Sequence, residues 1–193
     1  MCGPVDVVLD GVGLPWVTYM TAKCQNVSIT QCADIACATG STTLVERQLQ
    51  QYFPDMNTIF SPSLAVRSDG SSLLLAFPSD TGSGSNGGGI SQGGVGNVAL
   101  ISSSPPAVHN KAVFANQTSR CVVATSAQFD AAVIAYVMDR PAPDYVAVVV
   151  SECADTSCSS LQGTQTLETG GESLYFQILP LHFCSRITDP VWR

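Results

Sequence analysis

Short runs of apolar residues recur along the chain, separated by clusters of turn-forming residues. Residues 73–77 and 133–137 are almost entirely apolar, and other runs alternate between apolar and polar positions. Both patterns are typical of β-strands, since alternation marks a half-exposed strand and a continuous run marks a buried one. The Asp-Gly pairs at 10–11 and 69–70 predict hairpin turns, because both residue types tolerate the positive φ of tight turns.

The aromatic residue that closes the second run of each group marks a repeat of about sixty residues. These aromatics are Tyr19, Phe77 and Tyr136, at steps of 58 and 59. Cys32 and Cys153 lie 121 residues apart, which is two such steps. Self-similarity at a fixed period is the signature of a repeat architecture. The sequence therefore predicts an all-β chain of tandem four-stranded antiparallel sheets, arranged like β-propeller blades.

The spacing divides the chain into three units and the start of a fourth. We expect these at 1–60, 61–120, 121–183 and 184–193, with a Gly- and Ser-rich surface insertion at 79–96. Propellers usually hold four to eight blades, so three units do not comfortably close a ring. Other chains could complete the ring, the first and last strands could share a blade, or the chain is a fragment of a longer array. We favour the last explanation.

The composition agrees with sheets and restricts the partners. Charged residues make up 12% of the chain, about half of the roughly 25% usual in globular domains. The net charge of −7 leaves no basic patch, so we expect no nucleic-acid partner. The apolar runs are too short to span a bilayer, and no leader precedes the first of them, which predicts a mature piece or an excerpt of a longer chain.

Eight cysteines indicate an oxidising compartment. Two pairs occur in near-identical Cys-x4-Cys contexts, and a disulfide across each six-residue turn would fix a hairpin register and contribute ~2 kcal/mol. These pairs are Cys32 with Cys37 and Cys153 with Cys158.

The other four cysteines allow three connectivities. Cys2 and Cys24 flank one predicted hairpin, which favours a bridge between them, while Cys121 is placed to reach a neighbouring repeat and Cys184 follows the same spacing. Two sequons, at Asn26 and Asn116, would permit N-glycosylation on a secretory route.

The order of these motifs resembles the tandem repeats of large secreted or cell-surface proteins that form propeller-like sheets. In such repeats one strand ends in Asp-Gly, the next ends in an aromatic residue, and a third runs into Cys-Ala-Asp-x-x-Cys. The matching residues are 10–11, Tyr19 and 32–37, and in the third unit Tyr136 and 153–158. The middle unit departs by lacking both cysteines. The resemblance implies a fold and an extracellular setting and names no activity.

Residues with catalytic or metal-binding chemistry do not form a convincing constellation. His109 and His182 lack metal-ligand spacing, and no element that would support Cys2 as an amino-terminal nucleophile is apparent. Asp34 and Asp155 are expected to cap their turns rather than bind calcium, since each turn supplies one carboxylate. We therefore expect no catalytic residue, no metal and no cofactor.

Four aromatic residues recur at matching strand positions, namely Trp16, Tyr19, Phe77 and Tyr136. Packing between neighbouring blades is the first explanation for them. The alternative is a set of exposed rings that stack on sugars, which would make the chain a carbohydrate-binding propeller lectin.

Together these features predict an extracellular, glycosylated structural or interaction module within a larger secreted or surface assembly. Its expected partners are other copies or subunits of that assembly, with glycans as a further class. A lectin is the first alternative. The second is a fragment of a glycoside-hydrolysing propeller, which needs a buried carboxylate pair that the turn-like Asp6, Asp10, Asp69 and Asp130 do not convincingly supply.

Overall fold

A computed structural model describes residues 5–21, 26–46, 62–79, 94–103, 106–126, 131–139 and 146–168. Within these ranges every regular element is a β-strand, so none of them holds a helix that could cross a membrane. The strands are β1 (Asp6–Leu9), β2 (Pro15–Thr21), β3 (Asn26–Cys32), β4 (Gly40–Glu46), β5 (Ser63–Val66), β6 (Ser72–Ser79), β7 (Gly94–Ser103), β8 (Pro106–Ser126), β9 (Ala131–Asp139), β10 (Val146–Cys153) and β11 (Leu161–Glu168).

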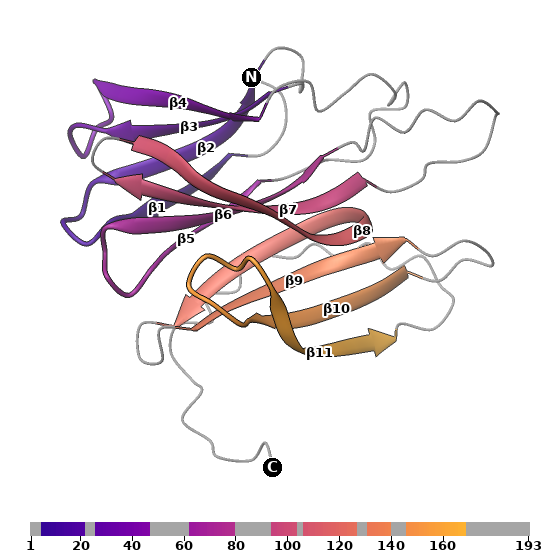
Figure 1. The fold of residues 1–193 in the computed structure, drawn as a ribbon. Coiled ribbons are helices and arrows are strands. Elements are labelled where there is room, and N and C mark those ends of the chain that lie inside the picture. Colours follow the sequence, from indigo (N-terminus) through magenta and orange to yellow (C-terminus); the bar gives the residue numbers. More distant parts are fainter. Residues whose placement is uncertain are drawn as a thin grey trace.

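The strands form three four-stranded antiparallel units (Figure 1). The first unit is the separate sheet β1-β2-β3-β4. The second and third share β8, whose first part pairs with β7 and whose last part pairs with β9, so hydrogen bonding joins them into one seven-stranded sheet. Strand β8 is 21 residues long and crosses from the fourth position of the second unit to the first position of the third.

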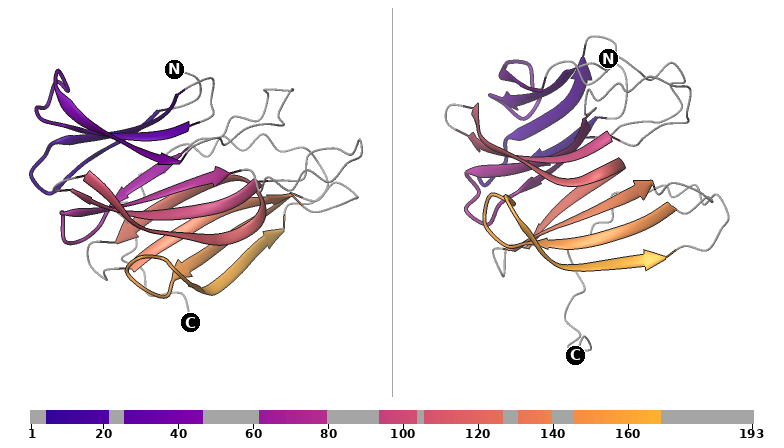
Figure 2. Two further views of the ribbon diagram at one scale, coloured as in Figure 1. Left: turned by 45° about the horizontal axis from the view of Figure 1, so that its top comes forward. Right: turned by 45° about the vertical axis from the view of Figure 1, so that its right-hand side comes forward.

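The three units are stacked with their faces together (Figure 2). We call the face of a unit that lies on the side of the following unit its forward face, and the opposite one its rear face. Trp16 and Ile29 on the forward face of the first unit pack against the rear face of the second unit. Leu74 and Val98 on the forward face of the second unit pack against Ile134 and its neighbours on the rear face of the third.

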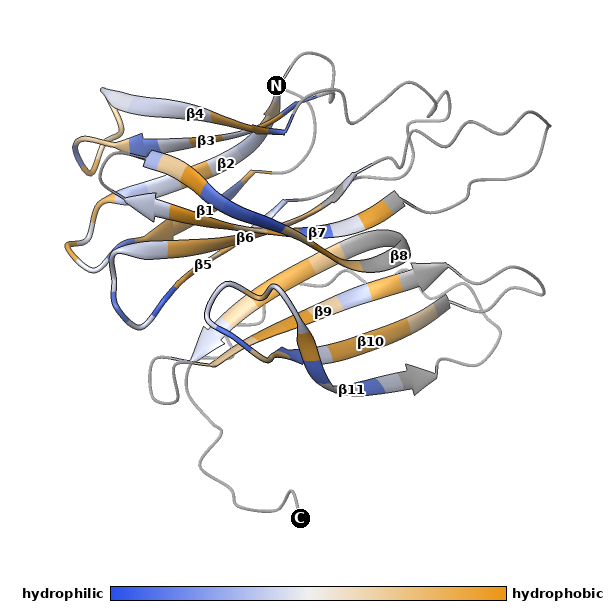
Figure 3. Ribbon diagram, viewed as in Figure 1, coloured by the Kyte–Doolittle hydropathy of each residue, from blue (hydrophilic) through white to orange (hydrophobic). Residues whose placement is uncertain are grey.

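The middle unit is therefore buried on both faces, which explains the uninterrupted apolar run in β6. Leu73, Leu75 and Phe77 belong to the core shared with the first unit, while Leu74 and Ala76 belong to the core shared with the third. All five side chains are at most 1% exposed. The same apolar character extends along β9 and β10 (Figure 3). A strand covered on both faces needs apolar residues at every position rather than at every second one.

Hydrogen bonds between the first strands of the units hold the stack in register. Oδ2 of Asp6 in β1 accepts from the backbone N–H of Leu64 in β5 at 2.8 Å, a separation of 58 residues. The Val123 N–H in β8 donates to the Ser63 hydroxyl at 3.3 Å, 60 residues away. The hydroxyl of Thr125 donates to the carbonyl of Val66, 59 residues away. These separations equal the spacing seen in the sequence, so corresponding positions of neighbouring units lie beside one another.

The first hairpin turns of the first and second units also touch. The Gly11 N–H donates to the Gly70 carbonyl at 3.1 Å. A Cβ atom built on Gly11 would lie 3.0 Å from the Cα of Gly70, closer than most real Cβ contacts, so the two backbones would have to move apart by a few tenths of an ångström. Gly70 in addition has a φ of +65°, a conformation that favours glycine. Glycine is thus favoured at both positions by the close approach of the two backbones, and at Gly70 also by its φ.

The sequence-based prediction of an all-β chain built from four-stranded antiparallel units is confirmed. Within the predicted insertion at 79–96, Ser79 belongs to β6 and residues 94–96 belong to β7, so the regular sheet extends into both of its ends. The remainder of the insertion and the expected fourth unit at 184–193 lie outside the described residues.

We predict that Leu75→Ala lowers the free energy of unfolding by about 3 kcal/mol, because it deletes buried methyl groups and leaves a cavity between the first and second units. Val113→Ala is the control, since Val113 is 59% exposed and its truncation should cost less than about 0.5 kcal/mol. Urea denaturation of both variants tests this. Equal midpoints for the two variants would contradict the packing described above.

Candidate functional site

Four aspartate-bearing turns lie at the same end of the stacked sheets, on the left in Figure 1. Two are the first hairpin turns of the first and second units, with Asp10 and Asp69. The other two follow β3 and β10 and carry Asp34 and Asp155. This turn end is the part of the described chain where polar side chains and irregular backbone are concentrated, so it is the candidate functional site.

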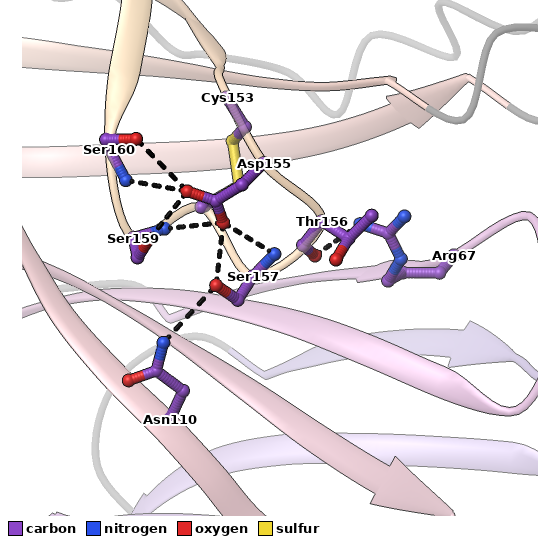
Figure 4. Close-up of a disulfide and its surroundings, with 9 residues drawn as sticks. Arg67, Asn110, Cys153, Asp155, Thr156, Ser157, Ser159 and Ser160 are labelled. Atoms are coloured by element: carbon purple, nitrogen blue, oxygen red, sulfur yellow. Dashed lines mark hydrogen bonds between the residues drawn. A yellow bond between two sulfur atoms is a disulfide. The ribbon is translucent and has the colours of Figure 1, made fainter.

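The loop after β10 is held by a disulfide and by one carboxylate (Figure 4). Cys153 and Cys158 are bonded, with their Cα atoms 4.7 Å apart, within the usual range for a disulfide. The Asp155 carboxylate accepts hydrogen bonds from both the N–H and the hydroxyl of Ser157, Ser159 and Ser160, at 2.5 to 3.2 Å. The hydroxyls of Ser157 and Ser159, followed by backbone amides, hold the pKa of Asp155 well below its ordinary value.

The loop after β3 has the same construction with fewer hydrogen bonds. Cys32 and Cys37 are bonded, and their Cα atoms are 4.8 Å apart. The Asp34 carboxylate accepts from the Ala38 N–H at 3.2 Å and from the Thr39 hydroxyl at 3.4 Å. The backbone hydrogen bond from Ala38 is the largest cause that lowers the pKa of Asp34.

Both second cysteines adopt a backbone conformation that favours glycine. Cys37 has a φ of +53° and Cys158 a φ of +54°. Each donates its N–H to the carbonyl of the aspartate three residues earlier, at 3.0 and 3.1 Å. A left-handed conformation costs a residue with a Cβ of order 1 kcal/mol, so the disulfide and the aspartate hydrogen bonds stabilise a turn that the local sequence alone would not favour.

Asp10 and Asp69 organise the first hairpin turns in a similar way. Oδ1 of Asp10 accepts from the N–H groups of Val12 and Leu14 at 3.0 and 2.9 Å, and its Oδ2 accepts from Nε1 of Trp16 at 3.3 Å. Asp69 accepts from the N–H groups of Ser71 and Ser72 and from the Ser72 hydroxyl. Partial burial opposes ionisation of Asp69, but these hydrogen bonds outweigh it and lower the pKa of the carboxyl.

A shallow hollow of about 600 Å³ lies between the turns of the first and second units. Its walls come from both first hairpin turns and from the strand ends beside them, and most of its side chains are small or polar. The lining residues are Asp10, Gly11, Val12, Leu14, Gln31, Ser41, Asp69, Gly70, Ser71, Ser103 and Pro106.

The third unit's disulfide loop is also fastened to the second unit. The Arg67 guanidinium, only 7% exposed, donates to the Thr156 carbonyl. Nδ2 of Asn110 donates to the Ser157 hydroxyl at 3.3 Å (Figure 4). Sequence reasoning missed Arg67 and Asn110. The available signal was that Arg67 stands two residues before an Asp-Gly turn in a chain with few cations.

Sugar stacking, the alternative considered for the four recurring aromatic residues, does not fit three of them. Trp16, Phe77 and Tyr136 are at most 5% exposed, because each points into a core between two units. Tyr19 is half-buried on the rear face of the first unit, where its hydroxyl hydrogen-bonds that of Thr30 at 3.1 Å. Packing between neighbouring units is the observed role of the three buried rings.

Cys121 differs from the expectation of a disulfide. It lies in the core between the second and third units and carries a free thiol. Burial raises the pKa of this thiol far above its ordinary value, so it is an inert apolar side chain. Cys2, Cys24 and Cys184 lie outside the described residues.

The glycosylation candidates occupy strands. Asn26 is the first residue of β3 and is half-buried, opposite Thr21 of β2. Asn116 belongs to β8. Glycosylation of Asn26 or Asn116 stays a prediction.

The carboxylates considered for glycoside cleavage are occupied by turn and strand contacts. Asp6 binds the Leu64 N–H, whereas Asp10 and Asp69 cap their own turns. Asp130 and His182 lie outside the described residues, and His109 is exposed on β8. Among the residues that the structure describes, no cluster of three or more His, Cys, Asp or Glu side chains could hold a metal ion.

Comparison of the chain with protein-family models, with curated proteins and with solved structures finds no match. The geometry of the turn end is that of a surface held by disulfides and by hydrogen bonds to aspartate carboxylates.

We predict that Asp155→Asn lowers the free energy of unfolding at pH 7 by about 1 kcal/mol, since an amide cannot accept all of the hydrogen bonds of the carboxylate. Because folding depresses the pKa of Asp155, the stabilisation is present above the ordinary value of about 3.9 and is lost as the pH falls below it. The two proteins should therefore converge in stability towards pH 2. Denaturant titrations between pH 2 and 7 measure this.

Asp34→Asn is the matched control, because Asp34 accepts fewer hydrogen bonds. It should change stability less than Asp155→Asn does. A pH-independent difference between Asp155→Asn and the parent protein would show that the charge of Asp155 has no part in holding the loop.

Proposed function

We propose that the chain is an extracellular structural or interaction module and part of a larger secreted or surface assembly. The observation that carries this proposal is the construction of its turn end. Two disulfide-closed loops and two aspartate-capped hairpin turns present side chains from a backbone with little freedom to move. Recognition surfaces of this kind lose little conformational entropy on binding.

The disulfides support the extracellular setting. Structural disulfides persist in oxidising compartments and are rare in the cytosol. Both bonded pairs close short loops in which the cysteines have no visible redox or metal-binding partner among the described residues. We infer a structural role for them in a secreted protein, with N-glycosylation at Asn26 or Asn116 as the accompanying modification.

We further propose that the units are arranged as the blades of a β-propeller. Each unit places its first strand beside the first strand of its neighbour and stacks its sheet on the neighbouring sheet. Radial repetition of four-stranded sheets in this order is the architecture of a propeller.

A glycan-binding role is the second candidate, and the hollow between the Asp10 and Asp69 turns favours it. Its walls offer Gln31, Ser41 and Ser103 as hydrogen-bonding side chains. Because the recurring aromatics are buried, any sugar would be held by hydrogen bonds at the turn end rather than by ring stacking.

We predict that non-reduced peptide mapping of the secreted protein finds Cys32 bonded to Cys37 and Cys153 bonded to Cys158, with glycan on Asn26 or Asn116. Free thiols at these four cysteines together with bare asparagines would overturn the extracellular assignment.

Replacing Cys153 and Cys158 together by Ser should lower the free energy of unfolding by about 2 kcal/mol, because the loop is then no longer closed by a covalent bond. Urea denaturation of the variant and the parent protein measures this difference.

A glycan array tests the second candidate. If the hollow binds a sugar, Gln31→Ala should weaken the binding about tenfold, as expected for one lost hydrogen bond in a binding site. Gln162→Ala is the control, because Gln162 is exposed on β11 and outside the hollow. An array without a hit would remove this candidate and leave the structural role.

A further inference from the structure

The rear face of the first unit carries an apolar patch, on β1 and β2, that no described part of the chain covers. Val5, Val7 and Leu9 alternate along and just before β1 and are 49%, 58% and 56% exposed. Val17 of β2 lies directly opposite Val7. Val17 and Tyr19 on β2 are half-buried. Such a concentration of exposed apolar side chains on one sheet face is unusual for an isolated soluble domain and marks an interaction surface.

The strand register identifies what this face corresponds to in the other two units. Val7 pairs with Val17 in the first unit, Leu64 pairs with Leu75 in the second, and Val123 pairs with Ile134 in the third. Leu64 and Val123 are each only 4% exposed, because the rear face of each unit is covered by the forward face of the unit before it. The rear faces of the second and third units are thus buried in interfaces, whereas the corresponding face of the first unit is open among the described residues.

The forward face of the third unit is also open among the described residues. Its forward face carries Val133, Ala135 and Val150, which correspond in register to Leu74, Ala76 and Val98 of the second unit. Leu74, Ala76 and Val98 are fully buried against the third unit, whereas Val133, Ala135 and Val150 retain partial exposure.

We propose that a second copy of this chain docks head to tail, with the forward face of its third unit on the rear face of the first unit. The contact repeats the packing already present between the units within one chain. Head-to-tail contacts either close into a ring or continue as a filament. The described residues of two copies supply six units, a number within the four to eight blades of known propellers, which lets the two head-to-tail contacts close a ring as a dimer.

This inference names the partner for the proposed role in a larger assembly and rests on that role. The head-to-tail dimer can be tested separately from the proposed extracellular role, because substitutions on the sheet faces leave the disulfides and the turn end unchanged. A monomeric chain with native disulfides would overturn the head-to-tail dimer and leave the extracellular module standing.

The test is sedimentation equilibrium of the 193-residue chain and of three variants. The parent protein should have twice the mass of one chain. Val7→Lys should raise the dissociation constant at least about 100-fold, because it places an uncompensated charge in the contact. Val113→Lys is the control, since Val113 has nearly the same exposure as Val7, 59% against 58%, but lies on β8 outside the contact. It should remain a dimer.

The third variant distinguishes a head-to-tail contact from a symmetrical one. Ala135→Glu changes the forward face of the third unit and should also give monomers. An equimolar mixture of Val7→Lys and Ala135→Glu should recover a dimer, because one contact is then unchanged and the other pairs a lysine face with a glutamate face. Circular dichroism of each variant shows that its sheets are intact.

Three results would overturn the proposal. The first is a parent protein that stays monomeric at 100-fold the concentration used for the variants. The second is a dimer that Val7→Lys leaves intact. The third is dissociation by Val7→Lys but not by Ala135→Glu, which would show that two rear faces pair with each other.

Discussion

Burial of the middle unit on both faces is the constraint on which the rest of the structure depends. A single antiparallel four-stranded sheet has one face to hide and cannot do so alone. Stacking provides the cover, and β6 is the strand that takes part in both cores. Because its side chains alternate between the two neighbours, every position from Leu73 to Phe77 has to be apolar. The outer units need only one apolar face each, yet both the first and the third unit retain apolar residues on their open faces as well.

The turn end is stabilised by a different kind of interaction. At each of the four aspartate turns a carboxylate accepts hydrogen bonds from the backbone N–H groups that the tight turn leaves without strand partners. Buried or crowded backbone groups must find such partners, and a short acidic side chain reaches them. The disulfides add a covalent limit in the two loops where a cysteine takes a left-handed conformation. The result is a surface whose shape is defined without a binding partner.

The same features set the state of the titratable groups that the structure describes. Carboxylates that hold turns have depressed pKa values or are committed to backbone contacts, and Cys121 is buried as a thiol of raised pKa. General acid–base catalysis needs groups that change protonation near the working pH and face a substrate. Among the described residues the carboxylates at the turn end hold the turns through backbone and hydroxyl hydrogen bonds.

Local features of the sequence determined the strands and the turns, because alternation, Asp-Gly pairs and Cys-x4-Cys loops act over a few residues. The spacing of about sixty residues also indicated which segments correspond. Only the tertiary structure decided which face of each sheet is covered by a neighbouring unit and which is open. Alternation shows that Trp16 and Tyr19 lie on opposite faces of β2, but it does not tell which face a neighbouring unit covers. For the same reason the burial of the recurring aromatics, the sharing of β8 between two units and the contact of Asp6 with Leu64 could not be derived from the sequence.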